Sequence, residues 1–329
     1  MRRKIHPILV TGGAGFIGSA FVRLAVKSGY PIIILDKLTY AGDLKRLEGA
    51  LKPCKFYKAD ISDKSAVEKI LKKHKPQLVV NFAAETHVDR SIRDAAVFLK
   101  TNVIGTQILL DASRKYGINK FVHISTDEVY GEITKGEFTE CSAIKPNSPY
   151  AASKAAADLL INSYVRTYGF PAVIVRPCNN YGVWQYPEKL IPLSILKIFR
   201  GEDIPIYGSG RNVREWLYVD DCARGIMALL LKGKTGEVYN IGSDEERQNL
   251  DTIRMLLNVL GVSLDRIEFV KDRLGHDIRY RLNCLKTVRE TGWRPKVNLE
   301  EGLKKTVSWA KDNRGWLLSK WVSVAPLYK

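Results

Sequence analysis

The amino-acid sequence predicts an α/β protein with a doubly wound parallel sheet and a smaller C-terminal α/β lobe. Short apolar runs alternate with amphipathic helical segments through residues 5–177. A glycine-rich loop joins the first apolar run to the first helical segment, and after Pro177 the chain becomes rich in Asn, Gly, Pro and aromatic residues. Strand–helix–strand repetition predicts parallel strands with helices on both faces of the sheet.

Six apolar runs are the candidate strands of this sheet. They lack the alternation of polar and apolar residues that marks a half-exposed strand, so we expect burial on both faces. The runs cover residues 8–11, 32–36, 56–60, 78–83, 121–125 and 172–176. The helical segments between them cover residues 16–28, 64–73, 95–116 and 149–168.

The composition change at Pro177 predicts a boundary between two parts of the chain. We expect a nucleotide-binding domain at residues 1–177 and a substrate-binding lobe at 178–329, with elements near 216–241 returning to the first sheet. In the second part, helices are expected near 190–200, 220–231, 250–260 and 299–312, and strands at 216–219 and 238–241.

Composition excludes several classes of protein. The chain has 329 residues, 45% of them hydrophobic and 26% charged, which is typical of a globular protein. No apolar run approaches the ~18 residues that span a bilayer, and the basic N-terminus lacks a signal-peptide core. We therefore expect a cytoplasmic protein.

The five cysteines are scattered without C-x-x-C spacing, so neither disulfides nor a metal site is expected.

The net charge of +17 is the most unusual bulk property. It could indicate an anionic partner such as nucleic acid, a membrane or a phosphorylated substrate, or only a Lys/Arg-rich solvated surface. The basic residues are spread along the chain rather than gathered in one segment. We therefore expect no nucleic-acid or membrane partner.

The first loop carries a dinucleotide fingerprint. In "VTGGAGFIG", Gly12, Gly15 and Gly18 follow a strand pattern and open a helix pattern. A sharp turn, a close approach to a pyrophosphate and tight helix packing each favour a residue without a Cβ, and the helix N-terminus offers free N–H groups to phosphates. Glycines also serve turns alone, but this context predicts a Rossmann-type nucleotide site.

Two acids end the next two strands. A carboxylate at Asp36 would accept hydrogen bonds from the adenosine ribose and repel a 2′-phosphate, which favours NAD over NADP. Lys37 follows directly and weakens this preference slightly. Asp60 could contact the adenine edge, or it could cap the helix that begins near Asp63.

A tyrosine and a lysine stand four residues apart in "SPYAASKAAAD". Tyr150 and Lys154 would share one face of a helix. A phenol with a pKa near 10 is a poor base at neutral pH, and a neighbouring ammonium favours its phenolate. The pair suits proton transfer to or from an alcohol that is being oxidised, and the upstream fingerprint strengthens this interpretation.

Two adjacent acids follow the fifth strand, in "HISTDEVYG". Asp127 and Glu128 could form a water-facing turn, or they could be a general acid and a general base above one substrate. Successive residues of an extended strand face opposite sides. Both carboxylates can therefore enter one site only if the backbone leaves the extended conformation, which we predict here.

The chain resembles the extended short-chain dehydrogenase/reductase family, and within it the nucleotide-sugar 4,6-dehydratases. The resemblance runs from residue 9 to about residue 280. It is carried by "VTGGAGFIG", "LDKLTYAGDL", "NFAAETHVDRSI", "TNVIGTQILLDA", "HISTDEVYGE", "SPYAASKAAAD", "RPCNNYGVWQYPEKLIPL", "NVREWLYVDD" and "VKDRLGHDIRY".

The resemblance implies an enzyme that dehydrates dTDP-glucose with tightly held NAD. The sugar would be oxidised at carbon 4, lose water across carbons 5 and 6, and regain the hydride at carbon 6. Glu128 would be the base and Asp127 the acid. Thr126 would contact the carbon 4 oxygen, Tyr150 would be the redox base, and Lys154 would hold the ribose. The acid role requires a raised pKa at Asp127, from burial or from the Glu128 charge.

The resemblance also implies two sets of binding residues. The cofactor would contact Gly12, Gly15, Phe16, Ile17, Gly18, Asp36, Lys37, Thr39, Asp60, Ile61, Ala83, Ala84, Thr101, Tyr150 and Lys154. The substrate would contact His87, Thr126, Asn180, Lys189, Arg214, Asn249, Arg273 and His276.

Several of these substrate residues also allow structural roles. Guanidinium forks suit a diphosphate at Arg214 and Arg273, but Arg214 could instead pair with a nearby acid. Lys189 could cap a helix, and His87 could serve packing. Thr86 and Leu274 depart from the usual Ser and Pro of the family pattern. The preference for a thymidine over a uridine nucleotide in the substrate is inferred only from the overall likeness to the family.

Two functions other than dehydration remain possible from the sequence, and a homodimer is also predicted. A 4-epimerase or decarboxylase of the same family would share the fingerprint and the Tyr/Lys pair but would not need Asp127 and Glu128. A non-catalytic NAD-binding protein with a basic surface for nucleic acid would not need to keep the four reactive side chains. We also expect a homodimer, in which segments 95–116 and 149–168 form a four-helix seam with a partner.

Overall fold

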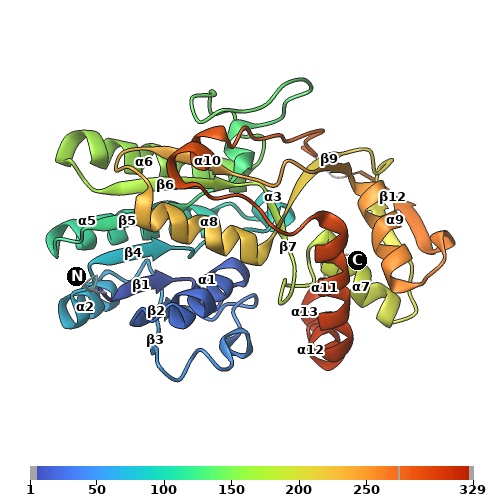
Figure 1. Ribbon diagram of the computed structural model, residues 1–329, viewed down its shortest axis with the longest axis horizontal. Coiled ribbons are helices and arrows are strands. Elements are labelled where there is room, and N and C mark those ends of the chain that lie inside the picture. Colours follow the sequence, from blue (N-terminus) through green and yellow to red (C-terminus); the bar gives the residue numbers. More distant parts are fainter. Residues whose placement is uncertain (1–5, 273–274, 326–329) are drawn as a thin grey trace.

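A seven-stranded parallel sheet forms the larger part of the protein (Figure 1). The computed structural model describes residues 6–272 and 275–325. The strand order is β10-β6-β5-β4-β1-β2-β3, with every pairing parallel. The strands are β1 (Ile8–Thr11), β2 (Ile32–Asp36), β3 (Lys55–Lys58), β4 (Leu78–Asn81), β5 (Lys120–Ile124), β6 (Ala172–Pro177) and β10 (Val238–Ile241). The predicted fold class is confirmed.

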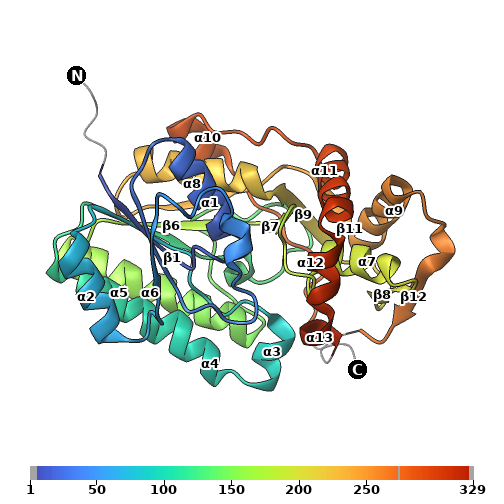
Figure 2. The same cartoon turned by 90° about the horizontal axis from the view of Figure 1, so that it is seen from below.

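Helices cover both faces of this sheet (Figure 2). One face carries α1 (Phe16–Lys27) and α8 (Val219–Lys232), and the other carries α2 (Lys64–His74), α5 (Thr106–Lys115) and α6 (Pro149–Tyr168). Alternate residues of each strand enter two separate cores: Val10 packs in the core on the α1 and α8 side, and Leu9 in the core on the α2, α5 and α6 side. The strands are therefore apolar throughout.

The third predicted strand differs from the expectation of burial on both faces. β3 lies at the edge of the sheet, and Lys55 and Lys58 are exposed at its two ends. Its only strand partner within the described residues is β2. Lysines on an edge strand discourage pairing with another chain, which explains the mixed composition of the run.

The predicted helix at residues 95–116 contains an irregular stretch. It begins as α4 (Ala96–Phe98), continues as a π-helical segment, η2 (Leu99–Gly105), and ends as α5. Such segments are rare and occur often at functional sites. This one places Thr101 at the edge of the main cavity.

The smaller lobe contains two short sheets and several helices (right in Figure 1). One sheet joins β11 (Glu246–Gln248), β9 (Val213–Tyr218) and β7 (Asn179–Tyr181), and the other joins β12 (Ile267–Val270) and β8 (Ile204–Tyr207). The helices are α7 (Leu190–Phe199), α9 (Asn249–Leu260), α11 (Leu299–Asp312), α12 (Arg314–Ser319) and α13 (Trp321–Val324). A third core fills this lobe.

The predicted return of residues 216–241 to the large sheet holds in part: β10 joins that sheet and α8 covers it, whereas β9 belongs to the lobe. The boundary at residue 177 stays a prediction.

Five further short helices connect these elements within the described residues. They are η1 (Leu44–Leu47), α3 (Val88–Arg93), η3 (Asp127–Tyr130), η4 (Leu264–Arg266) and α10 (Leu285–Thr291). None of the helices in the described residues is both long and apolar enough to cross a membrane. The cellular location expected from the sequence stays a prediction.

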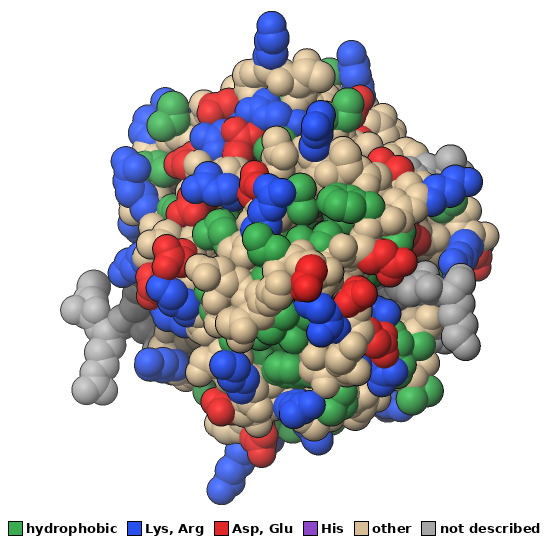
Figure 3. All heavy atoms as spheres, turned by 90° about the vertical axis from the view of Figure 1, so that its right-hand side faces the viewer, with side chains coloured by type: hydrophobic (Ala, Val, Ile, Leu, Met, Phe, Trp, Pro, Cys, Tyr) green, Lys and Arg blue, Asp and Glu red, His purple; other side chains and the backbone are tan. Residues whose placement is uncertain are grey.

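The surface of the smaller lobe is mixed in charge. Lys and Arg side chains are spread over the face in Figure 3, with Asp and Glu side chains between them. Ion pairs such as Lys304–Glu300 (2.5 Å) and Lys305–Glu301 (2.7 Å) occupy the exposed side of α11. On this face the basic residues do not form a continuous patch of the kind that binds nucleic acid.

Candidate active site

One cavity of about 430 Å³ opens at the carboxyl ends of β1, β4 and β5, beside the smaller lobe. In open α/β sheets, ligands bind where the chain leaves neighbouring strands toward opposite faces, and here that point lies between β1 and β4. Every predicted site residue among those described lines this cavity. Arg273 lies outside the described residues. The individual roles assigned from the sequence remain predictions.

The glycine loop has the geometry that a pyrophosphate site needs. Gly12 has φ +67°, and a Cβ there would lie 2.6 Å from the Ala83 nitrogen. A Cβ on Gly18 would collide with the Gly12 carbonyl, so this glycine allows α1 to pack against the loop. A Cβ on Gly15 would meet only the Gly12 oxygen, at 3.1 Å, and Gly15 lines the cavity. The three positions match the three roles expected of the fingerprint.

Asp36 is held in place for a hydrogen-bonding role at the end of β2. Its two oxygens accept the backbone N–H groups of Ala14 (2.9 Å) and Leu38 (2.8 Å). Burial raises the pKa of Asp36, and these two hydrogen bonds act in the opposite direction. A carboxylate has about four acceptor sites, so the oriented group can still accept hydrogen bonds from a ribose.

Lys37 and Asp60 form an ion pair of 2.8 Å at the edge of the cavity. Asp60 also accepts the backbone N–H of Ser62, whereas the cap of α2 is Asp63, whose side chain accepts the Ala66 N–H at 3.0 Å. Capping of α2 therefore does not explain Asp60. Because Lys37 is neutralised by Asp60, it adds little positive charge to the ribose end of the cavity.

Tyr150 and Lys154 lie one turn apart near the start of α6. Ser148 caps the helix by accepting the Ala151 N–H, and Pro149 follows at the first helical position. Burial and the Glu128 charge raise the pKa of Tyr150. Burial lowers the pKa of Lys154 to about 8. Its Nζ donates to the Ile124 carbonyl (2.6 Å) and lies 3.2 Å from His123 Nε2. In the protein alone, burial therefore outweighs the expected help of Lys154 to the Tyr150 phenolate.

The turn after β5 brings Thr126, Asp127 and Glu128 to the cavity. The backbone leaves the strand and forms the 3₁₀ helix η3, so the predicted non-extended conformation is confirmed. Thr126 caps η3 by accepting the Glu128 N–H at 3.3 Å, and its hydroxyl lies 3.2 Å from Asp127 Oδ1. Both carboxylates line the cavity.

The surroundings of Asp127 favour the protonated form of its carboxyl group. Its side chain is buried, and its Oδ2 has no hydrogen-bond partner among the described residues. Burial raises the pKa of Asp127 well above its ordinary range, and the charges of Glu128 and Glu215 act in the same direction. A protonated Asp127 can donate to a leaving hydroxyl.

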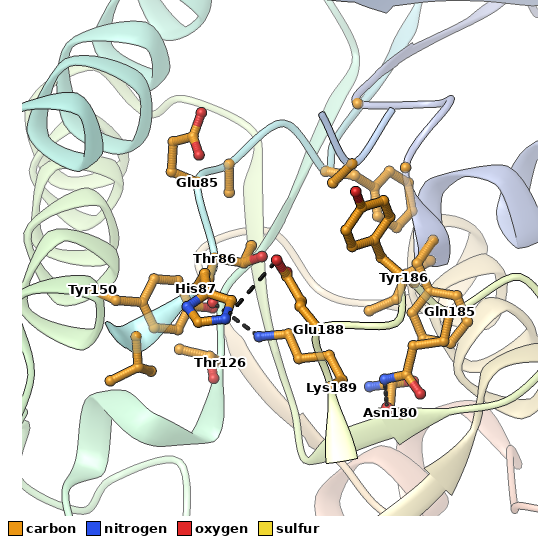
Figure 4. A pocket seen from close by; sticks show the side chains of 18 of the residues that line it. Glu85, Thr86, His87, Thr126, Tyr150, Asn180, Gln185, Tyr186, Glu188 and Lys189 are labelled. Carbon is orange, nitrogen blue, oxygen red and sulfur yellow. Dashed lines mark hydrogen bonds and ion pairs between the residues drawn. The ribbon is translucent and has the colours of Figure 1, made fainter. Parts of the chain in front are cut away.

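At the opposite wall of the cavity, Glu188 and Lys189 of the smaller lobe lie close to His87, which precedes α3 (Figure 4). His87 Nδ1 accepts the Arg90 N–H at 3.3 Å, and Nε2 lies 3.9 Å from Glu188 Oε2. Lys189 Nζ donates to the Thr86 carbonyl at 3.2 Å. Lys189 begins α7 without a side-chain cap. The Lys189 side chain therefore does not cap α7, whereas His87 caps α3 through Nδ1, and both side chains line the cavity.

Arg214 lies at the far end of the cavity. Its guanidinium donates to the carbonyls of Val213 (2.8 Å) and Asp277 (2.9 Å) and lies 4.6 Å from the Tyr280 ring centre. His276 Nδ1 is paired with Asp272 at 2.7 Å. A fixed guanidinium beside a histidine is a suitable site for phosphate oxygens.

Several cavity residues were not predicted from the sequence. The most notable are Glu85, Gln185, Tyr186, Glu188, Tyr207 and Trp216. Gln185 Oε1, Trp216 Nε1 and Asn249 Oδ1 are buried without a hydrogen-bond partner among the described residues, as expected of groups that serve a polar ligand. All of them except Tyr207 stand in motifs quoted for the resemblance, and that position was the signal that could have found them.

The sheet, the glycine loop and the Tyr/Lys pair define an enzyme of the dinucleotide-dependent short-chain dehydrogenase/reductase class. A sequence model of the family described as GDP-mannose 4,6 dehydratase matches residues 9–306. The chain belongs to this family of nucleotide-sugar enzymes, which confirms the resemblance seen in the sequence.

Individual relatives agree with this assignment. A dTDP-glucose 4,6-dehydratase of Streptomyces niveus is 48% identical over 317 residues, with 94% of each chain covered. The crystal structure of a dTDP-glucose 4,6-dehydratase from Streptomyces venezuelae, with NAD bound, has a TM-score of 0.92, 47% identity and coverage of 94% of this chain and 98% of that chain. A UDP-glucose 4-epimerase from Thermotoga maritima has a TM-score of 0.89, 34% identity and coverage of 94% and 99%.

Proposed function

We propose that this protein is an NAD-dependent hydro-lyase that converts dTDP-glucose to dTDP-4-keto-6-deoxyglucose. The observation that carries the proposal is the meeting of Thr126, Asp127 and Glu128 with Tyr150 in one cavity. Redox chemistry at carbon 4 needs the Tyr/Lys pair, and elimination across carbons 5 and 6 needs a separate acid and base. The cavity holds both sets.

The cavity residues suit the nicotinamide cofactor. Gly15 leaves room beside the backbone, Asp36 faces a ribose position, and Lys154 reaches the cavity from α6. Bound NAD would accept the hydride from carbon 4 and return it to carbon 6. The remaining chemistry is done by side chains of this chain.

Each proton transfer has a candidate group. Tyr150 takes the proton of the carbon 4 hydroxyl, while Thr126 holds that oxygen. Glu128 takes the carbon 5 proton, which the neighbouring ketone has made acidic, and gives a proton back to carbon 5 when the hydride returns to carbon 6. Asp127, kept protonated by burial, donates to the departing carbon 6 hydroxyl, so that water leaves.

The same fold also supports epimerases, as the Thermotoga maritima structure shows. An epimerase inverts carbon 4 and requires no acid and base at carbons 5 and 6, and a decarboxylase likewise would not need this pair. The buried, proton-holding Asp127 beside Glu128 therefore favours dehydration.

Turnover in heavy water tests the proposal. We expect purified protein to convert dTDP-glucose without added reductant, with deuterium entering carbon 5 and the carbon 6 hydroxyl lost, both followed by NMR of the product. Inversion at carbon 4 with carbon 6 intact would instead identify an epimerase. UDP-glucose as an alternative substrate tests the thymidine preference.

We also propose that the protein forms a homodimer through the helices on the α5 and α6 side. Large apolar side chains are exposed there at Val97 (38%), Leu99 (51%), Ile104 (50%) and Leu159 (58%). Gathered apolar side chains on a surface mark an interaction site. Light scattering is expected to give twice the chain mass of 37.1 kDa, and Leu159→Lys is expected to give monomers.

A further inference from the structure

A row of buried polar side chains crosses the sheet behind the cavity. Thr11, Asn81 and His123 are register partners on β1, β4 and β5. Thr11 Oγ1 lies 2.6 Å from the Asn81 side-chain amide, and that amide lies 3.1 Å from His123 Nδ1. His123 Nε2 lies 3.2 Å from Lys154 Nζ on α6. The row therefore ends at the lysine of the proposed redox pair.

Polar groups in this position need a reason. All four side chains are at most 2% exposed, and the strands around them are apolar. Burying polar side chains costs free energy unless their hydrogen bonds are satisfied. Here they are hydrogen-bonded to one another, and the row ends at Lys154, which lines the cavity, so a role beyond folding is indicated.

Charged groups surround His123 on two elements. From α6 come Tyr150, Lys154 and Asp158, which lie one turn apart on one face, and from β6 comes Arg176. Arg176 Nε pairs with Asp158 Oδ2 at 2.9 Å, and Asp158 Oδ1 lies 4.0 Å from His123 Nε2. The groups from β4 and α5 are neutral: Asn81 and Thr106. Burial, and then the Lys154 charge, lower the pKa of His123 well below its ordinary range, so the ring is neutral.

A neutral imidazole has one N–H and one lone pair, which limits the hydrogen positions in the row. If Lys154 is an ammonium, it can only donate, so Nε2 must carry the lone pair and Nδ1 the hydrogen. The Nδ1–H group then needs an acceptor on Asn81. A half-turn of the Asn81 amide supplies its oxygen, and Thr11 can accept from the amide nitrogen instead. An uncharged Lys154 amine could either donate to Nε2 or accept from it, so only the ammonium form fixes the hydrogen positions in the row.

We propose that His123 is a positioning residue for Lys154: Asn81 fixes the ring as the Nδ1–H form, and the Nε2 lone pair holds the lysine ammonium. The Ile124 carbonyl takes a second hydrogen of Lys154, which leaves the third for the cavity that Lys154 lines. His123 itself does not line the cavity. The kinetic consequence of this inference rests on the proposed function.

Two amide substitutions separate positioning from packing. The His123→Gln side chain can place an acceptor near the Nε2 position that faces Lys154. The His123→Asn side chain reaches only the Nδ1 position, so Lys154 loses its acceptor. Without that acceptor the ammonium is disfavoured, and its support of the Tyr150 phenolate weakens.

We expect His123→Asn to lower kcat about tenfold and to move the ascending limb of its pH profile up by about one pH unit. The KM for the sugar should change less than about twofold, because His123 does not touch the cavity. His123→Gln should recover most of the activity and the original profile. His74→Gln, at the end of α2 beside Tyr57, is the control and should leave the profile unchanged. Equal activity and unshifted profiles in the Asn and Gln variants would overturn the proposal.

A measurement without turnover tests the hydrogen positions directly. The chain has five histidines, so the ring ¹⁵N signals of labelled protein can be assigned by their loss in His123→Gln. We expect His123 to show a protonated Nδ1 and an unprotonated Nε2 at about pH 6 to 7, where Lys154, whose pKa burial lowers to about 8, is still mainly an ammonium. A protonated Nε2 would contradict the proposal. The two proposals can fail separately. If the protein does not dehydrate dTDP-glucose but His123 shows the expected ring signals, the proposed function is wrong and the arrangement of His123 and Lys154 is still supported.

Discussion

Asp127 and Glu128 are adjacent in sequence but have different surroundings. Asp127 is 2% exposed, whereas Glu128 is half-buried at the edge of the same cavity. Burial favours the neutral form of Asp127, and the Glu128 charge acts in the same direction. These surroundings agree with the proposed roles, the proton on Asp127 and the base at Glu128, which two neighbouring letters of a sequence cannot distinguish.

Replacing Glu128 tests this assignment. Glu128→Gln keeps the size of the side chain but removes the base, so we expect carbon 4 oxidation to proceed and the elimination to stall. Turnover should fall at least about 100-fold, while the absorbance of reduced nicotinamide accumulates after substrate is added. Glu132→Gln, an exposed acid in the same loop, should turn over normally. Full activity of the Glu128 variant would remove Glu128 as the base.

At the scale of elements, the site depends on the way β5 ends. The strand delivers His123 to the buried row and then turns into η3, whose first two residues are the acids. Gly131 ends η3 with φ +80° and ψ −152°, a conformation almost restricted to glycine. The Lys145 carbonyl also occupies the position that a Cβ on Gly131 would take. This glycine fixes where the acid pair lies.

Gly131→Ala should therefore affect both folding and catalysis. We expect a loss of about 2–3 kcal/mol in the free energy of unfolding, from backbone strain and the collision together, and a lower kcat because the turn shifts. Gly136→Ala is the matched control: Gly136 also has a positive φ, +82°, but a Cβ there would meet only the end of the Ile133 side chain, at 4.0 Å, which is an ordinary contact. Urea unfolding should show a clearly smaller loss for the control. Equal losses would mean that strain alone acts at Gly131.

At the scale of the whole molecule, long periodic features were predictable and short polar ones were not. The strands β1, β2 and β10 and the helices α6 and α11 follow the predicted ranges because burial repeats along them. The strands β7 (NNY) and β11 (ERQ) are polar, and the apolar strands β8 (IPIY) and β12 (IEFV) lie outside the regular strand–helix alternation, so their pairing depends on distant partners. No local pattern distinguishes them from loops.

The residues of the site also divide into those that the sequence predicted and those that it did not. Tyr150, Lys154 and the acid pair stand in motifs whose spacing has a chemical meaning. His123, Asp158 and Arg176 lie within apolar strand and helix patterns, and only the register of the sheet brings them together. Glu188 and Trp216 reach the cavity from a different lobe. Contacts between residues so distant in sequence follow from tertiary packing and not from spacing.

The two lobes are joined beside the ribose end of the cavity by a small polar cluster. Asp43 Oδ2 accepts hydrogen bonds from Trp316 Nε1 (2.8 Å) and Lys320 Nζ (2.7 Å), which belong to the C-terminal helical region. Arg46, from the same loop as Asp43, donates to the Trp184 carbonyl at 2.9 Å. Burial alone would raise the pKa of Asp43, but Lys320, the Lys45 N–H and Trp316 together lower it to about 2.

Asp43→Asn should weaken this connection in a pH-dependent way. Asn can still cap η1 through its oxygen, but its NH₂ group would face two donors, so we expect a loss of about 1 kcal/mol in stability at pH 7. A carboxylate with a depressed pKa stabilises the fold fully above its unfolded value of about 3.9, and this contribution is lost as the pH falls through about 2. The difference from wild type should therefore shrink between about pH 4 and pH 2 in urea unfolding followed by tryptophan fluorescence.

Lys320→Met should reproduce most of the loss of stability at pH 7 and add little to Asp43→Asn, because both changes remove the same ion pair. A difference that stays constant down to pH 2 would show that the Asp43 charge does not join the lobes.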